Sequence, residues 1–315
     1  MERNYSVILF SMLLGIFLLL NSAGAEAGIP PANTQGTDRM WLDVPYASES
    51  ASQKMDIYLP KEGQGPFPVI LAIHGGGFCS GDKGTMEVDG ELTGLNRGYA
   101  VVSINYRLSS EAVFPAALFD VKAALRFLRA HAAEYQIDRR HIAVWGDSAG
   151  ANLAALAGTT AGHPELEDLT QGNAAESSAV NAVVAWFPPV NYLTEDAQFR
   201  AKGITPYFWT DLPDSDIAKY VGAPIQEISG LMRFTNPENF ITKDTVPFFI
   251  ENGAKDTVVP PEQGRDFAAR LKSAIGAEKV TYIQLPEAEH RVAHFMGTDN
   301  LDKVFAFLDK YLKNP

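Results

Sequence analysis

Short apolar runs alternating with helical stretches are the feature of this 315-residue sequence that most restricts its fold. The runs at 67–73 and 99–105 are continuously apolar and bounded by turn residues, which is typical of strands buried on both faces. After the second run, apolar residues recur at helical spacing over 115–135. Strand, crossover helix and strand predict an α/β fold, with a mainly parallel central sheet and helices on both faces.

The same alternation continues to the C-terminus. An antiparallel pair of strands is predicted to open the sheet at 39–45 and 54–59, where apolar residues alternate. Segment 188–245 interrupts the pattern with prolines and clustered aromatics, so we expect a small cap insertion within one domain of residues 28–315. The other predicted strands are 142–145, 182–187, 248–251 and 280–285, and the other predicted helices are 149–157, 261–275 and 300–312.

The first 27 residues have the pattern of a signal peptide. Arg3 and the terminal amine precede an uncharged apolar run at 7–20, which is shorter than the roughly 20 residues needed to span a bilayer. Small residues follow, so we expect cleavage before Glu26 or before Gly28. The mature protein is then periplasmic or secreted, without a stable membrane span. An uncleaved membrane anchor is the alternative.

Composition argues against several functions. The 26 basic and 38 acidic side chains give a net charge of −12, so the chain lacks the basic face that nucleic-acid binding needs. The single cysteine, Cys79, excludes an intramolecular disulfide and a Cys-based zinc site. His290 and His294 have the spacing of two zinc ligands, but Arg291 stands where a metalloprotease needs Glu. We expect no metal and no cofactor.

The run GDSAG at 146–150 matches the G-x-S-x-G pattern of a serine nucleophile. The predicted strand 142–145 precedes it and a small-residue helix follows, which is the strand–turn–helix context that such a turn requires. The turn places Ser148 at the positive end of the helix dipole. Ser148 is therefore the predicted nucleophile. An ordinary helix-capping serine is the alternative.

A second motif, HGGGF at 74–78, directly follows the predicted strand 67–73. Acyl transfer passes through a tetrahedral oxyanion, and glycines let backbone N–H groups approach this oxyanion closely. Lipases and esterases place such a glycine turn after the third strand of their sheet. The two motifs, each at the end of a predicted strand, together predict ester chemistry.

These and five further motifs occur in the order found in a known family. The chain resembles the α/β-hydrolase fold, specifically the hormone-sensitive-lipase-like branch and its bacterial feruloyl and acetylxylan esterase relatives. By this resemblance, the oxyanion donors are the backbone amides of Gly76, Gly77 and Ala149. The motifs are MDIYLP at 55–60, HGGGF at 74–78, NYRL at 105–108, FPAA at 114–117, GDSAG at 146–150, VGAPIQE at 221–227 and NGAKD at 252–256.

A serine nucleophile needs a base and an orienting acid, which follow it in the order acid, then histidine, in this fold. Asp256 lies just after the predicted strand 248–251 and is the predicted acid. His290, in the loop after the last predicted strand, is the predicted base. The family commonly has glycines around this histidine, whereas here the run is EAEHR, so His294 remains an alternative.

Aromatic residues are predicted to line the substrate pocket. Phe78 and Phe187 come from strand ends, and Phe208 and Trp209 come from the insertion. Apolar and aromatic walls with few polar groups suit ester substrates, although these side chains also suit the interior of a small cap. We expect a short acyl pocket.

The sequence thus predicts an exported serine carboxylic-ester hydrolase that acts on short-chain or aryl esters through a Ser-His-Asp triad. Acetyl or feruloyl groups of plant polysaccharide are candidate substrates. The alternatives are a general short-chain carboxylesterase or lipase, a serine peptidase and a non-catalytic α/β-hydrolase used for binding. The sequence leaves the oligomeric state open.

Overall fold

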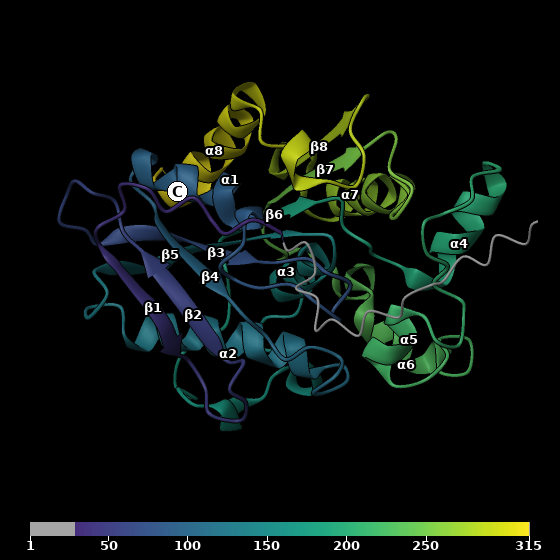
Figure 1. Cartoon of the computed structure of the whole chain (residues 1–315), viewed down its shortest axis with the longest axis horizontal. Helices are drawn as coiled ribbons and strands as arrows, with labels where there is room; N and C mark the ends of the chain where they lie inside the picture. Colours follow the sequence, from purple (N-terminus) through teal and green to yellow (C-terminus); the bar gives the residue numbers. More distant parts are fainter. Residues whose placement is uncertain (1–28, 315) are drawn as a thin grey trace, which may run out of the picture.

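The computed structural model describes residues 29–314 and contains one eight-stranded sheet (Figure 1). The strand order is β1-β2-β4-β3-β5-β6-β7-β8. The strands β1 (Met40–Pro45) and β2 (Lys54–Tyr58) are antiparallel, and β2 also pairs antiparallel with β4 (Ala100–Ile104). All other neighbouring strands are parallel, which confirms the predicted mainly parallel sheet. The remaining strands are β3 (Phe67–Ile73), β5 (Ile137–Asp147), β6 (Ala182–Trp186), β7 (Phe248–Gly253) and β8 (Val280–Leu285).

Helices cover both faces of the sheet, as the sequence predicts. One face packs against α2 (Ala116–Ala130), α3 (Ala149–Thr159) and α7 (Glu262–Ile275), and the other packs against α1 (Asp89–Leu92) and α8 (Thr298–Leu312). Figure 1 shows α1 and α8 above the sheet and α2 and α3 below it. Successive residues of β3 enter opposite cores, because side chains alternate along a strand.

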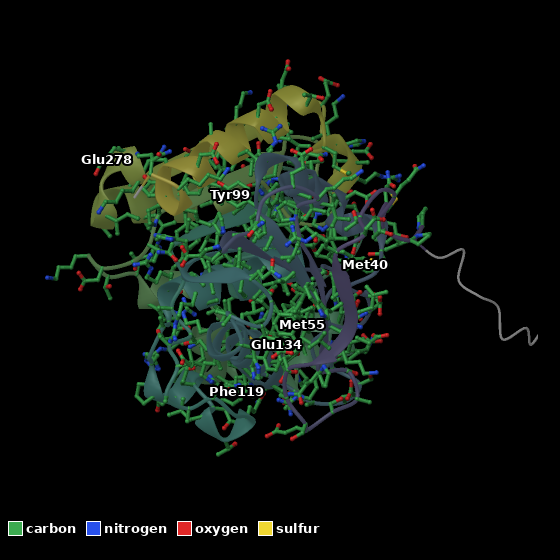
Figure 2. All side chains as sticks on the ribbon, turned by 90° about the vertical axis from the view of Figure 1, so that its left-hand side faces the viewer. Met40, Met55, Tyr99, Phe119, Glu134 and Glu278 are labelled. Atoms are coloured by element: carbon green, nitrogen blue, oxygen red, sulfur yellow. The ribbon has the colours of Figure 1, made fainter. Side chains whose placement is uncertain are left out.

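The outer strand β1 leaves part of the sheet edge open to solvent. Figure 2 shows this edge, with Met40 on β1 and Met55 on β2. Met40 is 42% exposed, whereas Met55 is completely buried. At the top of the same view, Tyr99 lies beneath α8, where its hydroxyl donates to Asp309 Oδ1 at 2.6 Å. The sheet and α8 are therefore joined by a polar contact as well as by apolar packing.

The expected insertion lies between β6 and β7 and contains three short helices. They are α4 (Tyr192–Ala201), α5 (Asp216–Val221) and α6 (Ser229–Thr235), which Figure 1 shows in green at one side of the molecule. Ser215 caps α5 by accepting the N–H of Ala218 at 3.1 Å. The insertion follows the carboxyl end of β6, so it begins at the sheet edge where Ser148 lies.

Two parts of the fold differ from the sequence prediction. β5 begins at Ile137 rather than at 142, so His141 lies inside this strand instead of before it. The first half of β5 carries exposed Arg139 and Arg140, which hide the apolar pattern of a buried strand. The prediction also lacks α1, which is a single turn between two short 3₁₀ segments.

Candidate active site

Ser148 lies at a sharp turn between β5 and α3. Its backbone has φ 51° and ψ −120°, a conformation that residues with side chains rarely adopt. The turn is tight, because a Cβ on Gly150 would lie 2.0 Å from the carbonyl oxygen of Ile73. The N–H of Ser148 donates to the carbonyl of Trp186 at the end of β6, 3.0 Å away. These contacts hold Ser148 at the carboxyl edge of the sheet.

Three side chains form a continuous chain of hydrogen bonds. Ser148 Oγ lies 2.8 Å from His290 Nε2, and His290 Nδ1 lies 2.8 Å from Asp256 Oδ2. A carboxylate only accepts, so Nδ1 carries the hydrogen and Nε2 of the neutral ring accepts from the Ser148 hydroxyl. The buried Asp256 also accepts the N–H groups of Val258 and Val259 at Oδ1, both at 2.8 Å. These bonds fix the orientation of the carboxylate.

The loop that carries His290 is ordered without the glycines expected from the family. His294 Nδ1 accepts the N–H of Glu289 at 2.9 Å, which closes the loop from within. The carbonyl of Ala288 accepts the N–H of Lys255 at 2.9 Å, which ties the loop to the Asp256 turn. Of the two candidate histidines, the structure therefore brings His290 to Ser148 and uses His294 inside the loop.

The glycine loop after β3 lies next to Ser148. A Cβ on Gly75 would lie 3.2 Å from Ser148 Cβ, and Gly76 and Gly77 follow with φ +96° and +60°. None of the backbone hydrogen bonds found outside helices and strands in residues 29–314 uses the N–H of Gly76 or Gly77. Ala149 is the first residue of α3, where an N–H has no intrahelical acceptor. Three backbone donors are thus available beside the Ser148 hydroxyl.

Polar contacts fix this glycine loop. The Tyr106 hydroxyl donates to the carbonyl of His74 at 3.0 Å. Asp82 accepts the N–H of Gly84 and the side-chain amide of Asn105, both at 2.8 Å, so it organises the turn that follows. Asp147 packs behind the loop, since a Cβ on Gly75 would lie 2.5 Å from its Oδ2. Asp82 and Asp147 therefore support the glycine loop from two sides.

A group of buried carboxyls behind the site was not found from the sequence. Burial raises the pKa of Glu87, Glu91 and Asp147 above their ordinary values, and their mutual repulsion raises the pKa of Glu91 and Asp147 further. Attraction to a protonated imidazole at His290 lowers the pKa of Glu87, against the effect of burial. The raised pKa values favour the protonated form of these carboxyls behind the glycine loop. Nothing in the spacing of residues 86–92 indicates this placement.

The four predicted pocket aromatics have different surroundings. Phe187 packs against His290, with ring centroids 4.5 Å apart. Phe78 is fully buried and stacks on Tyr220 at 3.6 Å, so its ring supports α5 rather than facing solvent. Phe208 is 54% exposed. Trp209 is half-buried beneath the guanidinium of Arg200, whose Cζ lies 4.6 Å from the ring centroid. The structure does not bring all four rings together around one pocket.

One segment of the insertion, 207–216, crosses from one side of the site to the other; we call it the bridging segment. The N–H of Tyr207 donates to the carbonyl of Thr257, next to Asp256, at 2.7 Å. At the other end, Asp216 Oδ2 lies 3.5 Å from where a Cβ on Gly77 would be. Nothing in the sequence pattern indicates this position of Asp216.

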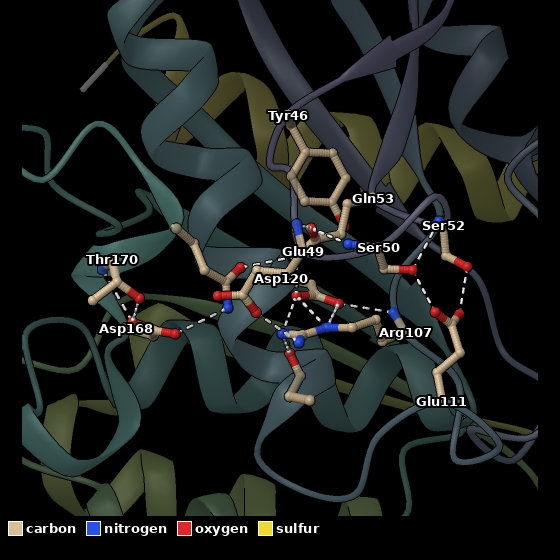
Figure 3. A network of polar contacts seen from close by, with 12 residues as sticks. Tyr46, Glu49, Ser50, Ser52, Gln53, Arg107, Glu111, Asp120, Asp168 and Thr170 are labelled. Carbon is tan, nitrogen blue, oxygen red and sulfur yellow. Dashed lines mark hydrogen bonds and ion pairs between the residues drawn. The ribbon is translucent and has the colours of Figure 1, made fainter.

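A surface hollow of about 660 Å³ lies along residues 107–116, and none of Ser148, Asp256 and His290 lines it. Figure 3 shows the polar network beside it. Arg107 donates to Asp120 and to Glu49, each at 2.7 Å, and Glu111 accepts the hydroxyls of Ser50 and Ser52. These groups are paired with one another, so the network joins the loop after β4 to the turn between β1 and β2.

The structure bears on two further expectations. Among residues 29–314, no three His, Cys, Asp or Glu side chains are grouped as metal ligands would be. Within the same described part of the chain, no helix is both long and apolar enough to cross a membrane. The predicted signal peptide, residues 1–27, lies outside the described residues.

Comparison with known proteins adds independent information. The BD-FAE family model matches residues 55–271. Esterase LipQ of Mycobacterium tuberculosis is 32% identical over 250 residues, which are 79% of this chain and 56% of that protein. Esterase LipC of the same organism is 30% identical over 261 residues, which are 82% of this chain and 60% of that protein. The chain thus spans little more than half the length of these curated relatives.

Two solved structures are also similar. A truncated carbohydrate esterase from gut microbiota has a TM-score of 0.79 and 30% identity, covering 90% of this chain and 99% of that one. A bifunctional GH43-CE protein of Bacteroides eggerthii has a TM-score of 0.75 and 30% identity, covering 87% of this chain and 38% of that one. The fold is that of the α/β-hydrolases, and the chain belongs to the BD-FAE family, within the hormone-sensitive-lipase-like esterases.

Proposed function

We propose that this chain is an exported serine carboxylic-ester hydrolase that acts on short-chain or aryl esters. The observation that carries the proposal is the hydrogen-bond chain from Ser148 through His290 to Asp256, with 2.8 Å at each step. These three side chains lie at the carboxyl edge of the sheet, beside the backbone N–H groups of Gly76, Gly77 and Ala149. The esterase names of the relatives agree with this chemistry.

In the first half of the reaction, Ser148 Oγ attacks the ester carbonyl carbon while His290 Nε2 takes the hydroxyl proton. The carbonyl π electrons move to oxygen, and this oxyanion accepts hydrogen bonds from the amides of Gly76, Gly77 and Ala149. The intermediate collapses when the C–O bond to the alcohol breaks. His290 gives its proton to the departing alkoxide, which leaves Ser148 acylated.

Water completes the cycle by the same route. His290 Nε2 takes a proton from the attacking water, and the second oxyanion occupies the same backbone donors. Collapse of this intermediate breaks the bond to Ser148 Oγ, which recovers the proton, and the carboxylic acid leaves. Asp256 keeps the imidazole in the required tautomer and stabilises its positive charge in both halves.

For the natural substrate, we propose acetyl or feruloyl groups of plant polysaccharide. Two observations support this class: a similar solved structure is a carbohydrate esterase, and the insertion presents exposed aromatic rings beside the Asp256 turn. A general short-chain carboxylesterase is the second candidate, which the names of the curated relatives favour. A binding protein without catalytic activity does not require a hydrogen-bonded Ser-His-Asp triad.

A substrate panel tests the proposed function. Wild type and Ser148→Ala are assayed on p-nitrophenyl acyl esters, methyl ferulate and acetylated xylan. Ser148→Ala is expected to lower kcat on the activated ester by roughly 10³-fold or more. An organophosphonate is expected to label wild type at Ser148 and to leave Ser148→Ala unlabelled. Labelling at a different residue would contradict the assignment of the nucleophile.

The proposed export has its own test. N-terminal sequencing of the protein purified from its native host is expected to begin at Glu26 or Gly28, in the periplasmic fraction or the medium. Recovery of a chain that begins at Met1 in the membrane fraction would support the uncleaved anchor instead.

A further inference from the structure

The bridging segment brings a charged pair to the oxyanion side of the site. Asp216 Oδ2 lies 3.5 Å from the position of a Cβ on Gly77, one of the proposed oxyanion donors. Asp216 Oδ1 accepts from Lys219 Nζ at 2.9 Å, one turn along α5. The two side chains are 39% and 57% exposed, so both are accessible to a bound substrate.

The shape of the bridging segment keeps Asp216 in this place. The Ser215 hydroxyl donates to the carbonyl of Thr210 at 2.9 Å, and Thr210 is itself held by Asp196 in α4 at 2.9 Å. Phe78, directly after the glycine loop, stacks on Tyr220 of α5 at 3.6 Å. The glycine loop and α5, which begins at Asp216, are therefore packed against each other.

A carboxylate at this position does not help simple ester hydrolysis. Negative charge that develops on the substrate oxygen is repelled by a nearby carboxylate, and Lys219 offsets this repulsion only in part. Within residues 29–314, the structure gives Asp216 Oδ2 no hydrogen-bond donor, so this oxygen faces the site with its accepting capacity free. A substrate hydroxyl is the neutral donor that suits it, since a carboxylate accepts from hydroxyl groups strongly.

We propose that Asp216, charge-balanced by Lys219, is a specificity-determining residue that accepts a hydrogen bond from a free hydroxyl of the substrate close to the scissile ester. The pair then favours acylated carbohydrates over esters of simple alcohols. This inference rests on the proposed serine-esterase function. The hydroxyl has two sources, a sugar carbon next to the acylated one or the phenol of a feruloyl group. The geometry favours the sugar, because Asp216 lies beside Gly77, one of the proposed oxyanion donors, whereas the phenol is at the far end of the acyl group.

Pairs of substrates that differ only in a free hydroxyl test whether this hydroxyl binds Asp216. The first pair is a mono-O-acetylated methyl pyranoside and the same compound with its other hydroxyls O-methylated. The second pair is methyl ferulate and its phenol-methylated analogue. Asp216→Asn keeps the shape of the side chain and removes its charge, and Lys219→Met removes the balancing charge. Asp214→Asn is the control, because Asp214 is an exposed carboxylate in the same segment.

The two variants are expected to act in opposite directions on p-nitrophenyl acetate. Asp216→Asn is expected to raise its kcat about twofold, because a charge that repels the oxyanion is gone, and Lys219→Met is expected to lower kcat by a similar factor. On the sugar acetate with free hydroxyls, Asp216→Asn is expected to lower kcat/KM about tenfold or more. On its O-methylated analogue, Asp216→Asn and wild type are expected to differ little. Asp214→Asn is expected to match wild type throughout.

Each result decides a different point. An equal loss in Asp216→Asn on both sugar acetates would show that the residue only supports the fold, and the inference would be wrong. A loss confined to methyl ferulate, and absent from its methylated analogue, would assign the hydroxyl to the acyl group and overturn the sugar assignment. A wild-type protein that cleaves no ester would overturn the proposed function itself, independently of Asp216.

Discussion

His294 explains how the loop after β8 holds its shape without glycines. Its Nδ1 accepts the N–H of Glu289 at 2.9 Å, while His290, four residues earlier, reaches Ser148. The two histidines therefore have separable tasks in one loop. His294 supports the loop through one hydrogen bond at Nδ1, whereas His290 contacts the nucleophile. Substitution of each histidine can therefore separate the two roles.

Substitution of each histidine tests this division. His290→Ala removes the proposed base, so kcat on p-nitrophenyl acetate is expected to fall by about 10³-fold. His294→Ala removes only the loop contact, so kcat is expected to fall by less than about tenfold. His294→Asn is expected to recover most of that loss, because an Asn side-chain oxygen reaches the same N–H as His Nδ1. If His294→Ala abolishes activity and His290→Ala spares it, the assignment of the base is wrong.

At the scale of elements, the bridging segment presents two exposed aromatic rings from a braced backbone. Tyr207 and Phe208 are 73% and 54% exposed and pack edge to face, with centroids 4.6 Å apart. The carbonyl of Thr257 and the carboxylate of Asp196 hold the backbone on either side of them. Because the backbone is fixed, the rings form a ready surface for the flat face of a sugar or an aryl group.

We expect the double variant Tyr207→Ala/Phe208→Ala to lower kcat/KM on acetylated xylan about thirtyfold. Each lost aromatic contact contributes about 1 kcal/mol, and about 2 kcal/mol corresponds to roughly a thirtyfold change. Activity on p-nitrophenyl acetate is expected to change by less than about twofold. The control is Leu169→Ala, since Leu169 is 50% exposed outside the insertion. Equal losses on the polymer and the small ester would contradict a role in polymer binding.

The small helices of the insertion also predict the acyl preference. The longest, α4, has 10 residues, so the insertion offers no long apolar helix to cover an extended acyl chain. Each methylene left unburied forgoes roughly 0.8 kcal/mol. We expect kcat/KM to be highest on acetyl and butyryl p-nitrophenyl esters, lower on methyl ferulate, and small beyond about ten acyl carbons. A value that rises steadily from butyrate to palmitate would instead indicate a lipase.

For the whole molecule, Glu251 links pH to stability. It is buried in the centre of β7, where Asn300 of α8 donates to its Oε2 at 3.0 Å. Burial raises the pKa of Glu251 from 4.5 to about 7 in the folded protein. Between these two values, the folded state binds a proton that the unfolded state has released. The free energy of unfolding therefore falls as pH rises from about 4.5 to 7, and this contribution is constant above 7.

Glu251→Gln keeps the shape and neutrality of the protonated acid at every pH. Relative to wild type, its free energy of unfolding in urea is expected to rise from pH 5 to pH 8, by up to about 3 kcal/mol. The control is Glu278→Gln, which changes an exposed carboxylate outside the Glu251–Asn300 contact, near the other end of α8 (Figure 2). A constant difference between Glu251→Gln and wild type across this pH range would show that Glu251 does not couple folding to proton binding.

Local spacing explains which parts of the molecule the sequence predicts. Five site residues follow soon after a strand with a clear apolar pattern, so their sequence neighbours identify them. They are Gly76, Gly77, Ser148, Asp256 and His290. Glu87 and Glu91 come from weak turns broken by glycines, and Asp216 comes from an insertion without strands. Their positions depend on how segments that are distant in the sequence pack against one another. Sequence patterns carry no information on such packing.

The two attachments of the bridging segment have a consequence for how this protein can be altered. At one end, the N–H of Tyr207 donates to the carbonyl of Thr257. At the other end, the segment continues into α5, where Tyr220 stacks on Phe78. A transplant of residues 204–222 from a relative retains both anchoring points, so substrate preference can be exchanged without changes to the sheet. A shorter graft separates one anchor from its partner. A graft that exchanges substrate preference in this chain therefore has to replace the segment as a unit.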